Sequence, residues 1–141
     1  MYNGFPLAIL DKNYIEKSVK TDKYNCIAWS LGIDTKWYWP STERPNEWLD
    51  HLPFENNIPN FIRFYNYFGY EVCDTHVLEE GYDKVAIYVR LKVKVTHAAK
   101  QITTNKWASK IGRFEDIHHT LGAIENLIYG EVSFFMKKKI N

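Results

Sequence analysis

The sequence predicts a single α+β domain, with helices in its first half and an antiparallel sheet in its second half. Before residue 70, apolar side chains recur at helical spacing, and after residue 80 β-branched and aromatic residues form short strand-like runs. The chain has 141 residues, which suffices for one hydrophobic core. No repeat, low-complexity segment or linker divides residues 1–141, so the whole chain is expected to be one domain.

The first predicted helix spans about residues 22–31. Thr21 or Asp22 can accept hydrogen bonds from the free amides at its start, and Gly32 suits the left-handed residue that ends it. Cys26 lies near this start, where the helix dipole favours a thiolate. The helix is therefore a candidate carrier of a nucleophile.

A second helix is predicted over residues 57–69, after an irregular connection rich in proline. Pro59 lies in its first turn, and Phe61, Phe64 and Phe68 repeat at helical spacing. The second half then changes to strand patterns. The expected strands cover residues 70–74, 84–89, 92–98, 107–111 and 131–136, with a helix over 121–129.

The composition gives no support to several classes of function. The net charge is +1, so nothing in it attracts nucleic acid. Two cysteines are too few for a disulfide scaffold, and no segment has the apolar length of a membrane span. No signal peptide is visible at the N-terminus, which predicts a cytoplasmic protein or one exported by a signal-peptide-independent route.

Cys26 and His97 form the predicted catalytic pair. A thiol nucleophile needs a group that removes its proton and later protonates the leaving group, and one imidazole can do both. His97 lies in a strand-like segment that could hold its ring rigidly. A third group should orient that ring: Asp116 is the first candidate and Ser109, on the neighbouring strand, is the alternative.

Aromatic residues make up 16% of the chain and are candidates for the walls of a substrate cleft. The competing interpretation is that they only cover the core. Lys110 either points into such a cleft or is solvated. No metal site is predicted, because His118 and His119 lack a third ligand at regular spacing, and no glycine-rich loop indicates a nucleotide cofactor. The predicted substrate-binding residues are Asn25, Trp37, Trp39, Trp107, Ser109 and Lys110.

Several of these motifs together resemble a known set. They are Tyr24-Asn25-Cys26-x-Ala28-Trp29-x-Leu31-Gly32, Trp37-x-Trp39-Pro40, Thr96-His97-Ala98-Ala99-Lys100-Gln101, Trp107-x-Ser109-Lys110-x-Gly112, Asp116-Ile117-x-His119 and Tyr129-Gly130. The chain resembles a family of small, uncharacterised bacterial domains that look like distant members of the papain-like superfamily, which includes the NlpC/P60 and CHAP amidases. The resemblance implies a papain-like fold, N-terminal helices packed on a C-terminal antiparallel sheet, with a Cys26 nucleophile and a His97 base.

The expected function is therefore a cysteine-dependent hydrolase or acyltransferase that acts, as a monomer and without a cofactor, on an amide or peptide bond. A bacterial effector that attacks cell-wall peptide is one form of this activity. The alternative is a non-catalytic binding or interaction module of the same fold with an aromatic cleft. The relative placement of Cys26 and His97 distinguishes the two.

Overall fold

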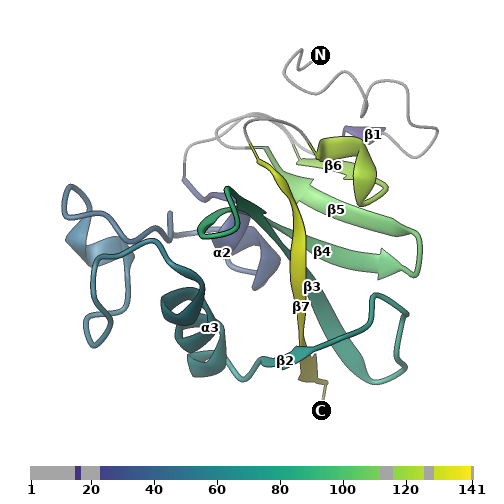
Figure 1. Ribbon diagram of the computed structural model, residues 1–141, viewed down its shortest axis with the longest axis horizontal. Helices are drawn as coiled ribbons and strands as arrows, with labels where there is room; N and C mark the ends of the chain where they lie inside the picture. Colours follow the sequence, from purple (N-terminus) through teal and green to yellow (C-terminus); the bar gives the residue numbers. More distant parts are fainter. Residues whose placement is uncertain (1–14, 17–22, 112–115, 126–128, 141) are drawn as a thin grey trace.

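A computed structural model describes residues 15–16, 23–111, 116–125 and 129–140. In these ranges the chain forms a seven-stranded antiparallel sheet of order β1-β6-β5-β4-β3-β7-β2, with α-helices α2 and α3 on one face (Figure 1). The strands are β1 (Ile15–Glu16), β2 (Glu71–Cys73), β3 (Tyr82–Arg90), β4 (Lys94–Thr103), β5 (Lys106–Lys110), β6 (Asp116–His119) and β7 (Glu131–Lys139).

Helix α2 (Cys26–Ser30) is shorter than predicted and begins at the cysteine itself. Asn25 caps it, because the Asn25 side chain accepts a hydrogen bond from the Ala28 amide at 3.1 Å. The predicted caps Thr21 and Asp22 lie outside the described residues. Gly32 follows the helix with a φ of +79°, as its predicted left-handed role requires.

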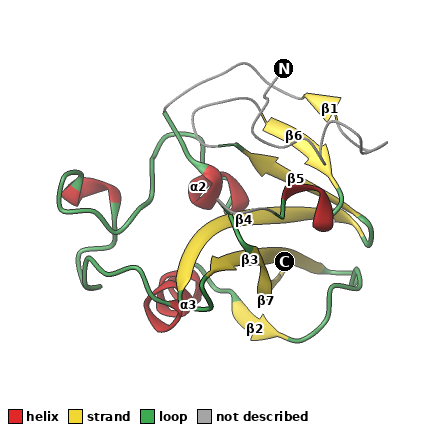
Figure 2. Cartoon of the chain, turned by 45° about the horizontal axis from the view of Figure 1, so that its top comes forward, coloured by secondary structure: helices red, strands yellow, loops and turns green. Residues whose placement is uncertain are grey.

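Helix α3 (Ile58–Tyr67) confirms the predicted second helix. The Asn57 side chain caps it by accepting a hydrogen bond from the Asn60 amide at 2.9 Å. Phe61 and Phe64 are fully buried, so the helical spacing of the aromatic residues marks the face that packs on the sheet. Figure 2 shows both α-helices beside the sheet.

The sheet separates two apolar clusters. On the helix face, Val85, Ile87 and Ala98 pack with the buried residues of α2 and α3. On the opposite face, which we call the open face, the cluster contains Ala86 and Tyr88 together with residues of β4, β5 and β6. A 3₁₀-helix, η2 (Gly122–Ile124), covers part of the open face; a second, η1 (Pro45–Glu47), lies in the connection between α2 and α3.

A bulge in β4 decides which face its side chains take. Tyr88 pairs with His97, but the next residue, Val89, pairs with Val95, so Thr96 is an extra residue. Side chains alternate between faces along a strand, and the extra residue reverses that alternation. His97 consequently points to the open face, where it contacts the Tyr88 ring, while Val95 points to the helix face.

The expected papain-like arrangement of N-terminal helices on a C-terminal sheet is wrong. β1 belongs to the first half of the chain and β2 to its middle, yet they pair with β6 and β7 and form the two edges of the sheet. Helix α2 has five residues, too few to form a helical layer. The helix predicted over residues 121–129 is replaced by the three-residue η2, and residues 126–128 lie outside the described ranges.

Candidate ligand-binding cleft

The structure places the two predicted catalytic side chains on opposite faces of the sheet. Cys26 belongs to the helix-face cluster and lies near the Ala98 backbone. His97, one residue earlier on β4, points to the open face. The chain therefore does not bring the Cys26 sulfur and the His97 ring together.

The environment of the Cys26 thiol also disfavours the thiolate. Burial raises the pKa of Cys26 to about 11, although the Ala98 and Ile27 backbones and the charge of Lys110 act in the opposite direction. α2 has a single turn, and its dipole does not offset this loss of solvation. At neutral pH the thiol is protonated and packs as a small apolar side chain.

His97 is enclosed by aromatic rings. Its ring stacks on Tyr129 at a centroid distance of 4.3 Å and meets the Tyr88 ring edge-on at 5.4 Å. The side chain is fully buried, and neither ring nitrogen has a hydrogen-bond partner among the described residues. Burial, followed by the neighbouring His119, lowers the pKa of His97 well below its usual value, so this imidazole is neutral.

Ser109, the alternative third residue, bonds to a different histidine. Its hydroxyl lies 2.6 Å from Nε2 of His119, and Nδ1 of His119 lies 2.6 Å from the Thr120 carbonyl. Nδ1 must donate to that carbonyl, so Nε2 accepts the Ser109 proton. Both side chains are fully buried, and the pair joins β5 to β6. Asp116 pairs with Lys110 in the same ladder, and its side chain lies outside the described parts.

The predicted substrate-binding residues are dispersed. Asn25 is buried and joins the loop after α2 by donating to the Tyr38 carbonyl at 2.6 Å. Lys110 is fully buried on the helix face, 5.5 Å from the centre of the Tyr24 ring. Trp37 stacks under the Arg44 guanidinium in the connection between α2 and α3, and Trp39 packs against Phe61 of α3 at 5.5 Å. Trp107 alone lies on the open face, in its apolar cluster.

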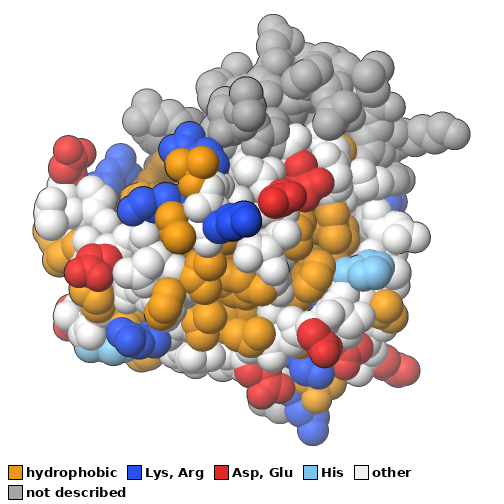
Figure 3. Space-filling view, viewed as in Figure 1, with side chains coloured by type: hydrophobic (Ala, Val, Ile, Leu, Met, Phe, Trp, Pro, Cys, Tyr) orange, Lys and Arg blue, Asp and Glu red, His pale blue; other side chains and the backbone are white. Residues whose placement is uncertain are grey.

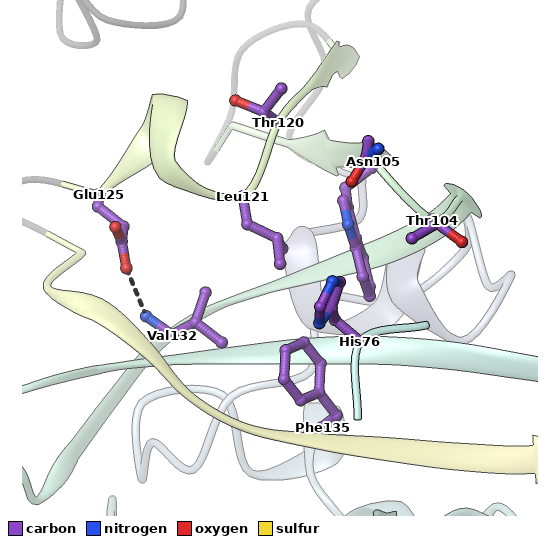
Figure 4. Close-up of a pocket in the computed structure, with 9 residues that line it drawn as sticks. His76, Thr104, Asn105, Thr120, Leu121, Glu125, Val132 and Phe135 are labelled. Atoms are coloured by element: carbon purple, nitrogen blue, oxygen red, sulfur yellow. Dashed lines mark hydrogen bonds between the residues drawn. The ribbon is translucent and has the colours of Figure 1, made fainter. Parts of the chain in front are cut away.

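A cleft of about 430 Å³ opens on this face beside Trp107 (Figure 4). Phe135 lies 5.9 Å from Trp107 and 6.3 Å from His76, measured between ring centres, so three rings from separate segments meet there. Leu121 and Val132 complete the apolar wall, and Figure 3 shows hydrophobic side chains gathered over β3 and β7 on this side. The rim is polar, with Thr104, Asn105, Thr120 and Glu125.

The polar rim of the cleft is held by hydrogen bonds to the backbone. Glu125 accepts from the Val132 amide at 3.0 Å, the dashed line in Figure 4. Gln101 donates to the His76 carbonyl at 2.5 Å, which fastens the loop before β3 to β4. The Nε1 donor of Trp107 is buried and has no hydrogen-bond partner among the described residues. A buried donor without an acceptor is the feature that a bound ligand or water would satisfy.

Comparison with known proteins gives a family but no activity. A family profile described as "Domain of unknown function (DUF7689)" matches residues 15–137. The chain belongs to the DUF7689 family. No curated protein and no solved structure matches it, and nothing in these comparisons ties it to papain-like or NlpC/P60 proteins.

The DUF7689 domain shows neither a metal cluster nor a membrane helix in its described residues. No three histidine, cysteine or carboxylate side chains gather there as ligands, so the structure offers no set of residues for a metal ion. None of the helices in the described ranges has the length and apolar character needed to cross a bilayer.

Sequence reasoning identified Trp107 as a wall residue but missed its partners. His76, Leu121 and Phe135 come from three separate segments, and no spacing in the sequence connects them. The aromatic excess was the only signal, and it indicates that rings are present without indicating which of them meet.

Lys84 anchors the loop that carries His76. Its ammonium is fully buried and donates to the Thr75 carbonyl at 3.0 Å, the Val77 carbonyl at 2.8 Å and the Glu79 carboxylate at 2.6 Å. Three acceptors compensate for the removal of the charge from water. These bonds attach the loop between β2 and β3 to strand β3, and they hold His76 at the wall of the cleft.

Lys84→Met should lower the free energy of unfolding by about 2 kcal/mol, because charge-assisted hydrogen bonds to fixed acceptors are lost. Urea denaturation of both proteins measures the difference. Lys137→Met is the matched control, since Lys137 also binds Glu79, at 3.1 Å, but is partly exposed. Its loss should be much smaller, and equal losses in the two variants would show that burial of Lys84 adds nothing.

Proposed function

We propose that this DUF7689 domain is a binding module whose ligand occupies the open-face cleft. The observation that carries the proposal is the meeting of Trp107, Phe135 and His76 rings below a rim of hydroxyl, amide and carboxylate groups. Concave, mostly apolar sites with a few polar groups are typical of small-molecule binding. The rings favour a flat aromatic or heteroaromatic ligand.

The charge of the cleft favours an uncharged ligand. Among the described residues that line it there is no lysine or arginine, and the one carboxylate, Glu125, is already bonded to the Val132 amide. A polar atom on the ligand could be bonded by Thr104, Asn105 or Thr120 at the rim. These groups would orient the ligand, while the apolar wall would supply most of the binding free energy.

Binding is supported over thiol hydrolysis by the arrangement of the sheet. Cys26 is protonated and lies on the face away from His97, and His97 itself is neutral and packed between two tyrosine rings. A thiol enzyme requires its nucleophile and base within hydrogen-bond reach. The cleft, in contrast, needs no rearrangement to accept a ligand.

Uncharged bicyclic fragments such as indole, quinoline and 2-naphthol should bind the wild-type domain, and ligand-observed NMR with saturation transfer measures this directly. Val132→Trp places a large ring in the cleft wall and should abolish the transfer. Val72→Trp makes the same change at an exposed position on β2 and should leave it intact.

Thermal unfolding of both variants establishes that they are folded. Absence of saturation transfer from the wild-type protein to any of the fragments, or equal transfer from the Val132→Trp protein, would refute the proposed site.

A further inference from the structure

A second cleft, the hairpin cleft, lies beside the turn that joins β3 to β4. Its volume is about 340 Å³, and it shares no lining residue with the open-face cleft. Two cations, two aromatic rings and two small polar side chains line it: Arg90, Lys94, Trp39, Tyr129, Asn56 and Thr96. Figure 3 shows Lys and Arg side chains beside hydrophobic ones around this hairpin.

The two cations of the cleft lie side by side on neighbouring strands. Arg90 and Lys94 are directly opposite in the β3–β4 ladder, and both are exposed. Like charges at such positions repel each other. Among the described residues no acidic side chain forms an ion pair with either of them, and Lys94 reaches only the Asn56 carbonyl, at 3.4 Å. An anion bound between them would remove this repulsion.

The backbone holds the two cations in this position. Leu91 and Lys92 form the turn with φ values of +56° and +65°, and the Val93 amide donates to the Arg90 carbonyl at 3.3 Å. Such a turn usually contains Asn-Gly, because residues with a Cβ disfavour positive φ. Its strained geometry nevertheless keeps Arg90 opposite Lys94, and strained backbone often accompanies ligand sites.

The strand on the other side of the hairpin is pinned as well. The Asn56 side chain donates to the Val95 carbonyl at 2.8 Å and accepts from the Val95 amide at 2.9 Å. Asn56 therefore holds the start of β4, the strand that carries Lys94, in a fixed position. The backbone that carries the cation pair is preorganised, which reduces the entropy lost when a ligand binds.

The aromatic walls are also supported from behind. The Tyr129 ring stacks on His97 with an angle of 14° between the planes, and Thr96 donates to the Tyr129 carbonyl. Trp39 is half-buried against Phe61. Both residues line the cleft, Trp39 from the helix-face cluster and Tyr129 from the open-face cluster, so a flat group between them could contact both while its charged end reaches the cations.

We propose that this hairpin cleft binds a small aromatic anion, a molecule with a flat ring and a phosphate or carboxylate group. The guanidinium of Arg90 and the ammonium of Lys94 bind the anionic group, and Trp39 and Tyr129 contact the ring. This site goes beyond the proposed open-face ligand, because it selects for negative charge and uses different residues.

Isothermal titration calorimetry with phenyl phosphate at 50 mM NaCl tests the inference. Phenyl phosphate should bind at least tenfold more tightly than either inorganic phosphate or phenol, and its affinity should fall as salt is raised. Equal affinity for phenyl phosphate and inorganic phosphate would contradict the proposed contacts of Trp39 and Tyr129 with the ring of the ligand. No detectable binding of phenyl phosphate would overturn the proposal.

Three single variants separate this site from general charge attraction. Arg90→Gln and Lys94→Gln should each weaken phenyl phosphate binding at least fivefold. Lys92→Gln removes the same charge from the same hairpin, but Lys92 does not line this cleft, so it should change affinity less than twofold. Equal loss of affinity in all three variants would show that phenyl phosphate is attracted by the overall positive charge of the hairpin and not by a defined site. Thermal unfolding should show no loss of stability in any of them, because each removes one of several neighbouring cations.

Discussion

Gly130→Ala should lower the free energy of unfolding by more than about 4 kcal/mol, or prevent folding entirely, because two independent penalties coincide there. A Cβ atom at this position would lie 2.1 Å from the Val89 carbonyl oxygen and 2.7 Å from its carbon. Both are backbone atoms of β3, an inner strand paired on both sides, which cannot move aside. The φ of +74° adds the strain of a left-handed residue.

Gly32→Ala isolates the second penalty. Gly32 has a similar φ of +79°, but a Cβ there would meet nothing within 4 Å. The expected loss is about 1–2 kcal/mol, the value for a left-handed residue with a side chain. Urea denaturation of both variants gives the comparison. Similar losses at the two glycines would mean that β7 and β3 do not approach each other as closely as described.

The stability of the domain should fall steeply below about pH 6.5, where a free histidine becomes protonated. Burial lowers the pKa of His97 in the native state, so between the two pKa values the unfolded chain binds a proton that the native protein excludes. Stability therefore rises with pH in this window and is lost as the pH falls. The slope from this one group approaches about 1.4 kcal/mol per pH unit.

His97→Phe removes the titrating group and keeps a ring between Tyr88 and Tyr129. The variant should show a flatter dependence of unfolding free energy on pH from 6.5 to 4.5, measured by urea denaturation at each pH. His51→Phe is the control, because His51 is exposed and its replacement should preserve the wild-type slope. An unchanged slope in the His97 variant would contradict the buried, neutral imidazole.

Local elements could be predicted because local chemistry determines them. Asn57, Pro59 and the phenylalanine spacing identify α3, and β-branched and aromatic runs identify β3 and β4 as strands. Asn25 was overlooked as the cap of α2, although asparagine is a strong N-cap residue. As a result the predicted helix began too early.

The separation of Cys26 from His97 could not be predicted because it depends on one unpaired residue in β4. In a regular strand, residues two apart point to the same face, so a regular β4 would place His97 on the helix face with Val95. Cys26 also lies on that face. Thr96 is extra in the register and reverses that assignment. A neighbouring shift in β7 at Ser133 accompanies it. Nothing in the run Val95-Thr96-His97-Ala98 indicates a bulge, since bulges depend on the partner strands.

The strand pairing was equally invisible. β1 and β2 have only two and three residues. Ile15 of β1 pairs with His118 of β6, and Glu71 of β2 pairs with Lys137 of β7, so each pairing closes a long loop of intervening chain. Patterns within a short window cannot reveal such pairings. The fold class consequently looked like two separate halves when the halves share one sheet.

The two apolar clusters meet only through the backbone of the sheet, and this has an evolutionary consequence. Ala86 and Ile87 are neighbours in sequence but belong to different clusters, so a change at one is shielded from the other by a layer of main chain. Substitutions on opposite faces should combine with little coupling. Residues of the open face could therefore change during evolution while those of the helix face stay the same. The ligand specificity of the open-face cleft could change in this way without loss of the packing between the helices and the sheet.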